Sequence, residues 1–203
     1  MSHLPLLSLI TFLPLVGAGF ILTIRGESDV VARNARNVAL LTSVTTFLLS
    51  LGVWFNFDTS TSAFQFQERA VWMPTFNIAY HLGVDGISML FVLLSTLLTP
   101  ICVLASWESI TERVKEYMIA FLVMETMMVG MFCALDLVVF YIFFEGVLIP
   151  MFLIIGVWGG GRRVYSAFKF FLYTLAGSVL MLLAILTMYF TTGTTDIPAL
   201  LKL

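Results

Sequence analysis

The sequence LVVFYIFFEGVLIPMFLIIGV, residues 137–157, decides the fold class of this chain. Its 21 residues contain one charged side chain, Glu145, and a helix of that length crosses a hydrocarbon core of about 30 Å. An ionisable side chain at such a depth is costly and faces protein or water rather than lipid, so Glu145 is a candidate functional residue. The alternative is a structural glutamate satisfied by a neighbouring helix, although an apolar residue would insert more easily.

The composition places the whole chain in the membrane class. Hydrophobic residues make up 60% and charged residues 11%, whereas soluble domains have about 25% charged residues. The net charge of −2 comes with no basic patch, so nucleic acid is not an expected partner. Cys102 and Cys133 lie in apolar segments, which favours small core residues over a disulfide or a metal site. His3 and His81 lie outside the apolar segments, which argues against a membrane haem held by two histidines.

The sequence predicts six transmembrane helices in a single membrane segment, residues 1–203. The first apolar stretch has no basic residue before it and is followed by Arg25 rather than by a small-residue cleavage site. We therefore interpret it as a retained helix and not as a signal peptide. The predicted helices are residues 4–24, 38–57, 87–107, 117–134, 137–157 and 167–189. The expected fold class is an all-α integral membrane protein.

The long connection between the second and third predicted helices, residues 56–85, has a different pattern. Phe64 and Phe66 alternate with glutamines. After the turn at Met73-Pro74-Thr75, large apolar residues again alternate with polar or smaller ones. Period-two patterns on both sides of a proline turn predict a short β-hairpin at the membrane surface.

The distribution of lysine and arginine predicts the orientation. The connections after the first, third and fifth helices, together with the start of the sixth helix, hold eight basic residues, and the opposite side holds two. The eight are Arg25, Arg33, Arg36, Arg113, Lys115, Arg162, Arg163 and Lys169, and the two are Arg69 and Lys202. By the positive-inside rule, the N-terminus and the hairpin face outward, and we expect a bacterial inner (plasma) membrane.

A proline in the helix of residues 137–157 bears on the chemistry of Glu145. Pro150 cannot donate a hydrogen bond to the carbonyl of Gly146, so a backbone acceptor is freed beside the acid. A free carbonyl and a small residue leave room for water or a partner side chain, although a packing kink explains Pro150 as well. A carboxylate whose charge depends on a movable partner can handle protons, so we predict proton translocation at Glu145.

A second acid, Glu125, lies in the preceding predicted helix. Glu125 comes ten residues before Leu135 and Glu145 ten residues after it, and Asp136 is a good N-cap for the later helix. Both acids are then about 15 Å from the turn, near mid-membrane depth. We predict that they are neighbouring stations of a proton relay. The alternative is that Glu125 points elsewhere and forms hydrogen bonds only.

Two further positions are weaker candidates. Lys169 is included as a weak proton-translocation residue, although its place near the inner surface favours a side chain that snorkels to water. Pro100 follows Ser95, Thr96 and Thr99, and it frees the carbonyl of Thr96. We interpret this as a polar kink that water can contact.

Three segments carry a resemblance to a known family. They are HLGVDGIS at residues 81–88, FFEGVLIP at 143–150 and KFFLYTLAGS at 169–178. Together they resemble chain M (subunit 4) of proton-translocating NADH:quinone oxidoreductase, respiratory complex I. The resemblance covers most of the chain from His81 onward. Related subunits of multisubunit sodium/proton antiporters share the glutamate at position 145 and are the alternative family.

The resemblance implies a proton-translocating membrane subunit without a redox centre of its own. In the family, the glutamate that maps onto Glu145 pairs with a lysine on the seventh helix. The resemblance also implies no cofactor on this chain, with flavin, iron–sulfur clusters and quinone on other subunits. The implied partners are other membrane-arm subunits, notably the paralogous antiporter-like chains, and the lipid bilayer.

The chain departs from the family in length. It ends at Leu203 after six predicted helices, so the partner lysine and the second inverted repeat are absent and we expect a fragment or a remainder that lies elsewhere. The rival from another class is a structural membrane scaffold in which Glu145 and Glu125 serve helix association. A scaffold would more readily use small residues, serine or threonine at these positions.

Overall fold

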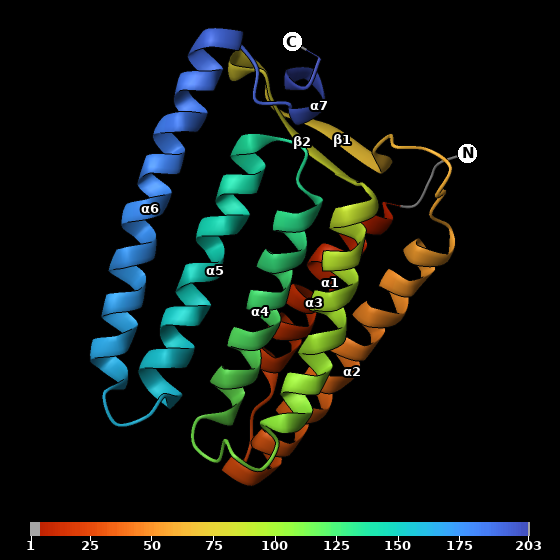
Figure 1. Cartoon of the computed structure of the whole chain (residues 1–203). Coiled ribbons are helices and arrows are strands. Elements are labelled where there is room, and N and C mark those ends of the chain that lie inside the picture. The colour runs from red at the N-terminus through yellow and green to blue at the C-terminus, as the bar shows by residue number, and fades with distance from the viewer. Residues whose placement is uncertain (1–4, 203) are drawn as a thin grey trace.

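The computed structural model describes residues 5–202, and six long helices run up and down in sequence order (Figure 1). All six are long and apolar enough to cross a membrane. They are α1 (Leu6–Thr23), α2 (Ser28–Phe55), α3 (Gly86–Ala105), α4 (Val114–Cys133), α5 (Leu137–Trp158) and α6 (Arg163–Thr192). The predicted fold class, an all-α integral membrane protein with six spans, is confirmed.

Helix α4 is at the centre of the arrangement. It packs against α1, α2, α3 and α5, whereas α6 packs against α5 at one edge of the molecule (Figure 1). The outward side of α6 exposes large apolar residues, among them Leu172, Leu180 and Phe190. Helices α1–α4 therefore form a four-helix bundle, and α5 and α6 extend it to one side.

Several helix boundaries differ from those expected from hydropathy. Helix α2 begins at Ser28, ten residues before the expected start at residue 38. Its first turns are polar because they project beyond the apolar region, and they are held by Arg36, which donates to the carbonyl of Ile110 and stacks on Trp107. Helix α6 is also longer than expected, and a short helix, α7 (Ile197–Leu200), follows it. The expected first residue of the first helix, Leu4, and His3 lie outside the described residues.

The predicted hairpin is present. Strand β1 (Gln65–Met73) pairs antiparallel with β2 (Ile78–Val84) through the short 3-10 helix η1 (Pro74–Phe76). Asn77 closes the turn in the left-handed region, with φ of 53°. The hairpin packs across one end of the bundle, against α1, α4 and α5 (Figure 1). We call this the hairpin end.

A buried polar network joins three distant segments at the hairpin end. The amide of Leu135 donates to the carbonyl of His81, and the amide of Ile197 donates to the carbonyl of Leu135. The His81 Nδ1 atom lies 2.6 Å from Asp196 Oδ1, and both side chains are buried. These bonds tie β2, the α4–α5 turn and the segment before α7 into one unit.

The α4–α5 turn also contains the expected helix cap. Asp136 Oδ1 accepts hydrogen bonds from the amides of Val138 and Val139, and Oδ2 accepts from the hydroxyl of Thr195 at 2.8 Å. Asp136 is fully buried. It is therefore both the N-cap of α5 and a member of the network that fixes the hairpin end.

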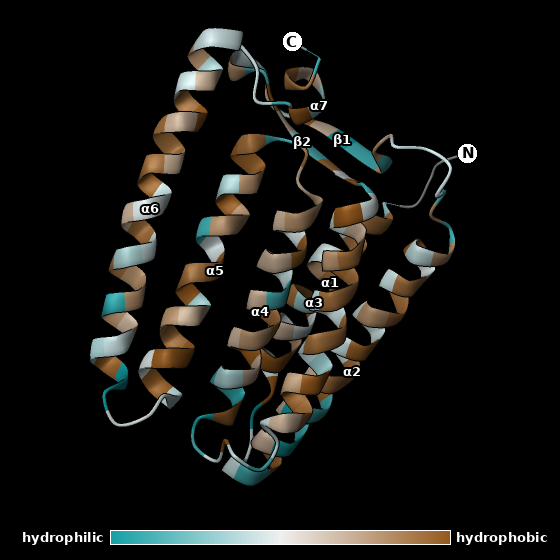
Figure 2. Cartoon of the chain, in the orientation of Figure 1, coloured by the Kyte–Doolittle hydropathy of each residue, from teal (hydrophilic) through white to brown (hydrophobic). Residues whose placement is uncertain are grey.

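Basic residues gather at the end opposite the hairpin. The eight residues expected to share one side are at the end of α1, in the first turns of α2, α4 and α6, or in the adjoining connections. Figure 2 shows the corresponding contrast, with apolar helix surfaces in brown and polar segments mainly at the helix ends and along the hairpin. Arg69 lies on β1 and Lys202 follows α7, so both are at the hairpin end.

Candidate functional site

Two close contacts fix the register between α4 and α5. A Cβ atom on Gly130 would lie 2.5 Å from the ring of Phe143, and one on Gly146 would lie 2.6 Å from Met127 Sδ. Gly146 is thus a position where α5 approaches α4 closely. In this antiparallel register Glu145 lies level with Met128, three residues from Glu125. The two glutamates therefore differ in depth by about 4.5 Å, less than one helical turn.

The side chain of Glu125 faces the α1–α4 bundle. On α4, Met118, Leu122 and Val129 share its face at helical spacing, and all three are fully buried in the bundle core. Met127 and Gly130, which face α5, lie on the other side of α4. Glu125 thus points away from α5.

The side chain of Glu145 faces α6. Tyr141 and Phe152, one turn before and two turns after it, lie on the same face of α5. Phe152 packs on Phe168 and Phe171 of α6, and the Tyr141 phenol lies near both the Glu145 carboxyl and Ser178 of α6. The structure therefore does not bring the two acids together: they lie at similar depth, but the α4 backbone separates them. Equal distance from the turn could not reveal this, because depth does not specify the face of a helix.

The surroundings of Glu145 leave its carboxyl only partly satisfied. The side chain is half-buried, and Oε1 is buried without a hydrogen-bond partner among residues 5–202. Pro150 is buried within a continuous α5, where it cannot donate to the Gly146 carbonyl. The α5–α6 interface therefore presents a carboxyl, two hydroxyl groups and a freed backbone carbonyl at one level.

Lys169 does not reach this group. Gly156 of α5 lies against Ala167 of α6, which puts Lys169 about nine residues, or roughly 13 Å, below the level of Glu145. Its side chain is exposed. This position agrees with a lysine that extends to the polar surface.

Sequence reasoning missed the environment of Glu125. Glu125 is completely buried, with 0% of its surface accessible. Neither of its carboxyl oxygens has a hydrogen-bond partner among the described residues. The adjacent hydroxyl of Thr126 is also buried without a partner. The sequence did contain a signal for this polar environment. Ser43, Thr46 and Ser50 recur at helical spacing on α2, which packs against α4, and all three are fully buried.

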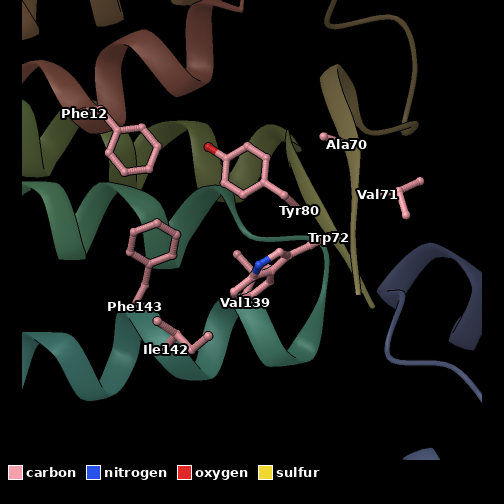
Figure 3. A pocket seen from close by; sticks show the side chains of 8 residues that line it. All are labelled: Phe12, Ala70, Val71, Trp72, Tyr80, Val139, Ile142 and Phe143. Carbon is pink, nitrogen blue, oxygen red and sulfur yellow. The ribbon is translucent and has the colours of Figure 1, made fainter. Parts of the chain in front are cut away.

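A cavity of about 400 Å³ lies at the hairpin end between the hairpin, α1 and α5 (Figure 3). Aromatic and aliphatic side chains line it, including Phe12, Trp72 and Phe143, and the Tyr80 phenol adds a polar group. Tyr80 is hydrogen-bonded to Ser8 at 2.9 Å, and burial raises the pKa of its phenol. The cavity suits hydrocarbon and does not contain either glutamate.

No group of histidine, cysteine and acidic side chains among residues 5–202 has the arrangement of a metal site. The candidate site therefore consists of two separate carboxyls: Glu145 between α5 and α6, and Glu125 within the α1–α4 bundle.

Six apolar spans define a polytopic membrane protein, and the acids Glu125 and Glu145 lie near the middle of two of these spans. Residues 28–135 match the family model for the amino terminus of NADH-ubiquinone oxidoreductase chain 4, and residues 134–203 match the transmembrane model of NADH:quinone oxidoreductase and Mrp antiporters. The chain belongs to the NADH-ubiquinone oxidoreductase chain 4 family, as its motifs indicated.

Relatives agree with this assignment. The chain is 55% identical to NADH-quinone oxidoreductase subunit M of Rhodobacter capsulatus, over 97% of this chain and 38% of the relative. It is 50% identical to NADH-ubiquinone oxidoreductase chain 4 of Marchantia polymorpha, over 96% of this chain and 39% of the relative. The chain thus spans about two fifths of the length of these relatives.

Solved structures show the same fold. A chain of respiratory complex I from Thermus thermophilus aligns with a TM-score of 0.79 and 29% identity, over 94% of this chain and 38% of that chain. A chain of the Mrp complex from Dietzia aligns with a TM-score of 0.77 and 20% identity, over 94% of this chain and 20% of that chain. The second likeness concerns the fold alone.

Proposed function

We propose that this chain is the N-terminal part of a proton-translocating membrane-arm subunit of NADH:quinone oxidoreductase, with Glu145 as its principal proton-handling residue. One observation carries the proposal: a half-buried carboxyl halfway along α5 faces α6, has one buried oxygen without a partner among the described residues, and lies near the phenol of Tyr141, which is itself near Ser178 of α6. Membership of the chain 4 family supports it.

The chemistry follows from the unmatched charge. A cation that approaches a carboxyl favours its ionised form, and the withdrawal of that cation favours the protonated form. Glu145 has no cation at its level among the described residues, since Lys169 lies nearer the other end of α6. A movable cation from another helix would make Glu145 take up and release a proton. Glu125 is a secondary candidate, supported by its burial but not by contact with Glu145.

Quinone reduction, with its flavin and iron–sulfur clusters, belongs on other subunits, and this chain contributes no redox centre. Its partners are other membrane-arm subunits, notably paralogous antiporter-like chains. The basic residues gathered opposite the hairpin support an orientation with the hairpin and N-terminus outward, in a bacterial inner membrane.

A subunit of a multisubunit sodium/proton antiporter is the second candidate. The transmembrane family model that matches residues 134–203 covers Mrp antiporters as well as NADH:quinone oxidoreductase, which favours it. The Glu145 carboxyl suits a proton or a sodium ion equally well. Transport assays with and without sodium at fixed pH distinguish the two.

The test is the Glu145→Gln variant in the intact assembly. Glutamine keeps the shape and hydrogen-bonding capacity but cannot ionise, so we expect normal assembly on native gels and loss of most proton pumping. Glu145→Asp should retain part of the activity. Glu108→Gln, an exposed acid in the connection before α4, is the matched control. Near-normal pumping by a fully assembled Glu145→Gln variant would overturn the proposal, and lost assembly with intact transport per complex would favour a scaffold.

A further inference from the structure

The middle of the α1–α4 bundle contains a layer without buried aliphatic side chains. Two apolar clusters flank this layer. The cluster at the hairpin end includes Ile10, Val53, Val92 and Val129. The cluster at the opposite end includes Ala18, Ala39, Val103 and Leu122. Between these positions every buried residue of the four helices is Ser, Thr, Glu, Pro or Gly. The residues are Thr11, Pro14, Gly17, Ser43, Thr46, Ser50, Ser95, Thr96, Thr99, Pro100, Glu125 and Thr126. We call them the mid-bundle layer.

Interhelical contacts place the centre of this layer at Glu125. Lys115 Nζ donates a hydrogen bond to the carbonyl of Ile24, so Lys115 of α4 lies near the level of Ile24 at the end of α1. The two helices are antiparallel, so ten residues forward on α4 and ten residues back on α1 bring Glu125 level with Pro14. Gly17 lies against Thr42, so Pro14 is level with the turn that holds Thr46. The hydroxyls of Ser50 and Thr96 are 2.8 Å apart, which brings Thr46 level with Pro100. All four helices thus contribute to one level.

The hydrogen bonds within the layer leave acceptors in excess. The hydroxyl of Thr11 donates to Leu7 O, that of Thr46 to Thr42 O, and that of Thr99 to Ser95 O. Their protons are therefore used within their own helices, and their oxygen lone pairs remain available.

The two prolines add further acceptors. Pro14 and Pro100 have no amide hydrogen, so the carbonyls of Ile10 and Thr96 lose their helical donors. The groups of this layer that lack a hydrogen-bond partner are the hydroxyl of Thr126, which can donate, and the two carboxyl oxygens of Glu125. An ionised carboxylate only accepts hydrogen bonds, whereas a neutral carboxylic acid also donates one. The layer therefore matches the neutral acid.

No cation among the described residues lies at this level to favour the ionised form. Helix α1 has no ionisable residue, and α3 has only Cys102, which is exposed. The charged residues of α2, Asp29, Arg33 and Arg36, are in its first turns at the opposite end. On α4 itself, Lys115, Glu116 and Tyr117 are also in the first turns, and Cys133 is the last residue. On the remaining neighbours, Glu145 and Tyr141 of α5 face α6. The ionisable residues of the hairpin, Glu68 and Arg69 of β1 and Tyr80 and His81 of β2, are all at the hairpin end.

We propose that the mid-bundle layer is a closed, water-binding proton site in which Glu125 is held as the neutral acid. Bridging water would satisfy the Glu125 and Thr126 oxygens through the free hydroxyl lone pairs and carbonyls, as buried water does where several polar groups converge. The apolar clusters close the layer toward both ends of the bundle, so this proton exchanges slowly with water. Packing of small residues alone explains the serines and threonines but leaves a fully buried glutamate without partners.

Infrared spectroscopy of the intact assembly tests this site. The difference spectrum between the wild type and Glu125→Gln should contain the C=O stretch of one protonated carboxyl per chain. This band should persist at alkaline pH, where exposed acids are ionised, and should shift slowly in D₂O. A carboxylate band in its place would overturn the proposal.

A matched pair of variants tests the layer as the partner of Glu125. Thr46→Val removes a buried hydroxyl of the layer, and Thr45→Val removes an exposed hydroxyl of the same helix that also donates to its own helix. The carboxyl band should shift in Thr46→Val and remain unchanged in Thr45→Val. Equal bands in both would overturn the role of the layer. These two variants keep Glu125, so they decide the question even if Glu125→Gln fails to assemble, and neither depends on pumping through Glu145.

Discussion

Glu125 and Glu145 lie within one helical turn of each other in depth, yet their side chains point to opposite sides of the α4–α5 pair. The similar depth follows from the register, which is set by the contacts of Gly130 with Phe143 and of Gly146 with Met127. The opposite directions follow from the packing: Phe152, on the face of α5 that carries Glu145, packs on α6, and the face of α4 that carries Glu125 packs in the bundle core. The two acids belong to separate environments.

Separate environments predict additive effects on stability. Changes in the free energy of unfolding at sites without shared partners add to within about 0.5 kcal/mol, whereas changes at members of one hydrogen-bond network depart further from the sum. The double variant Glu125→Gln/Glu145→Gln should therefore change the free energy of unfolding by the sum of the single changes. Denaturant unfolding of the detergent-solubilised protein measures all three variants, and a larger deviation from the sum would show that a water chain or side chain links the two sites.

The close approach of α4 and α5 predicts a steric effect at Gly130. Its added Cβ would lie 2.5 Å from the Phe143 ring, so Gly130→Val overpacks the interface and should destabilise the protein by about 1–3 kcal/mol. Gly177→Val, on the open side of α6 with nothing within 4 Å, is the control and should be nearly neutral. Gly146→Ala should be milder than Gly130→Val, because the end of the flexible Met127 side chain can move. The measurement is the melting temperature of the three variants, and equal melting temperatures for Gly130→Val and Gly177→Val would refute the proposed register.

The sequence predicts local structure better than it predicts which helices a side chain faces. Hydropathy located the spans, alternation around Pro74 located the hairpin, and the position of Asp136 indicated a helix cap, because each signal depends on neighbouring residues. The face of Glu125 depends on which helices surround α4, and that requires the tertiary arrangement. The His81–Asp196 pair joins residues 115 positions apart and left no local signal. The early start of α2 was missed because a helix can continue beyond the apolar segment that identifies it.

The buried His81–Asp196 pair predicts a stability effect at the hairpin end. The atoms Nδ1 and Oδ1 are 2.6 Å apart, so Asp196→Asn replaces a charge-assisted hydrogen bond with a weaker one and should cost about 1–3 kcal/mol. Asp58→Asn, an exposed acid at the same end whose pKa is lowered by the Ser60 hydroxyl and amide, is the control and should have little effect. The melting temperature of each variant is the measurement. An Asp196→Asn protein as stable as Asp58→Asn would mean that the backbone bonds around Leu135 hold this end without the His81–Asp196 hydrogen bond.

The distribution of basic residues predicts the orientation of the protein in its membrane. Eight lysine and arginine residues lie at the end opposite the hairpin and two at the hairpin end, which by the positive-inside rule places the hairpin outside. Single cysteines introduced at Thr61, beside the hairpin, and at Gly160, in the α5–α6 connection, report the two ends because both positions are exposed. The exposed native Cys102 is first replaced by serine. An impermeant thiol reagent added to intact cells should label Thr61→Cys, and it should label Gly160→Cys only after the membrane is opened. The buried native Cys133 should remain unlabelled in both cases and serves as the internal control. Labelling of Gly160→Cys but not Thr61→Cys in intact cells would reverse the orientation, and with it the side from which a proton enters the α5–α6 interface.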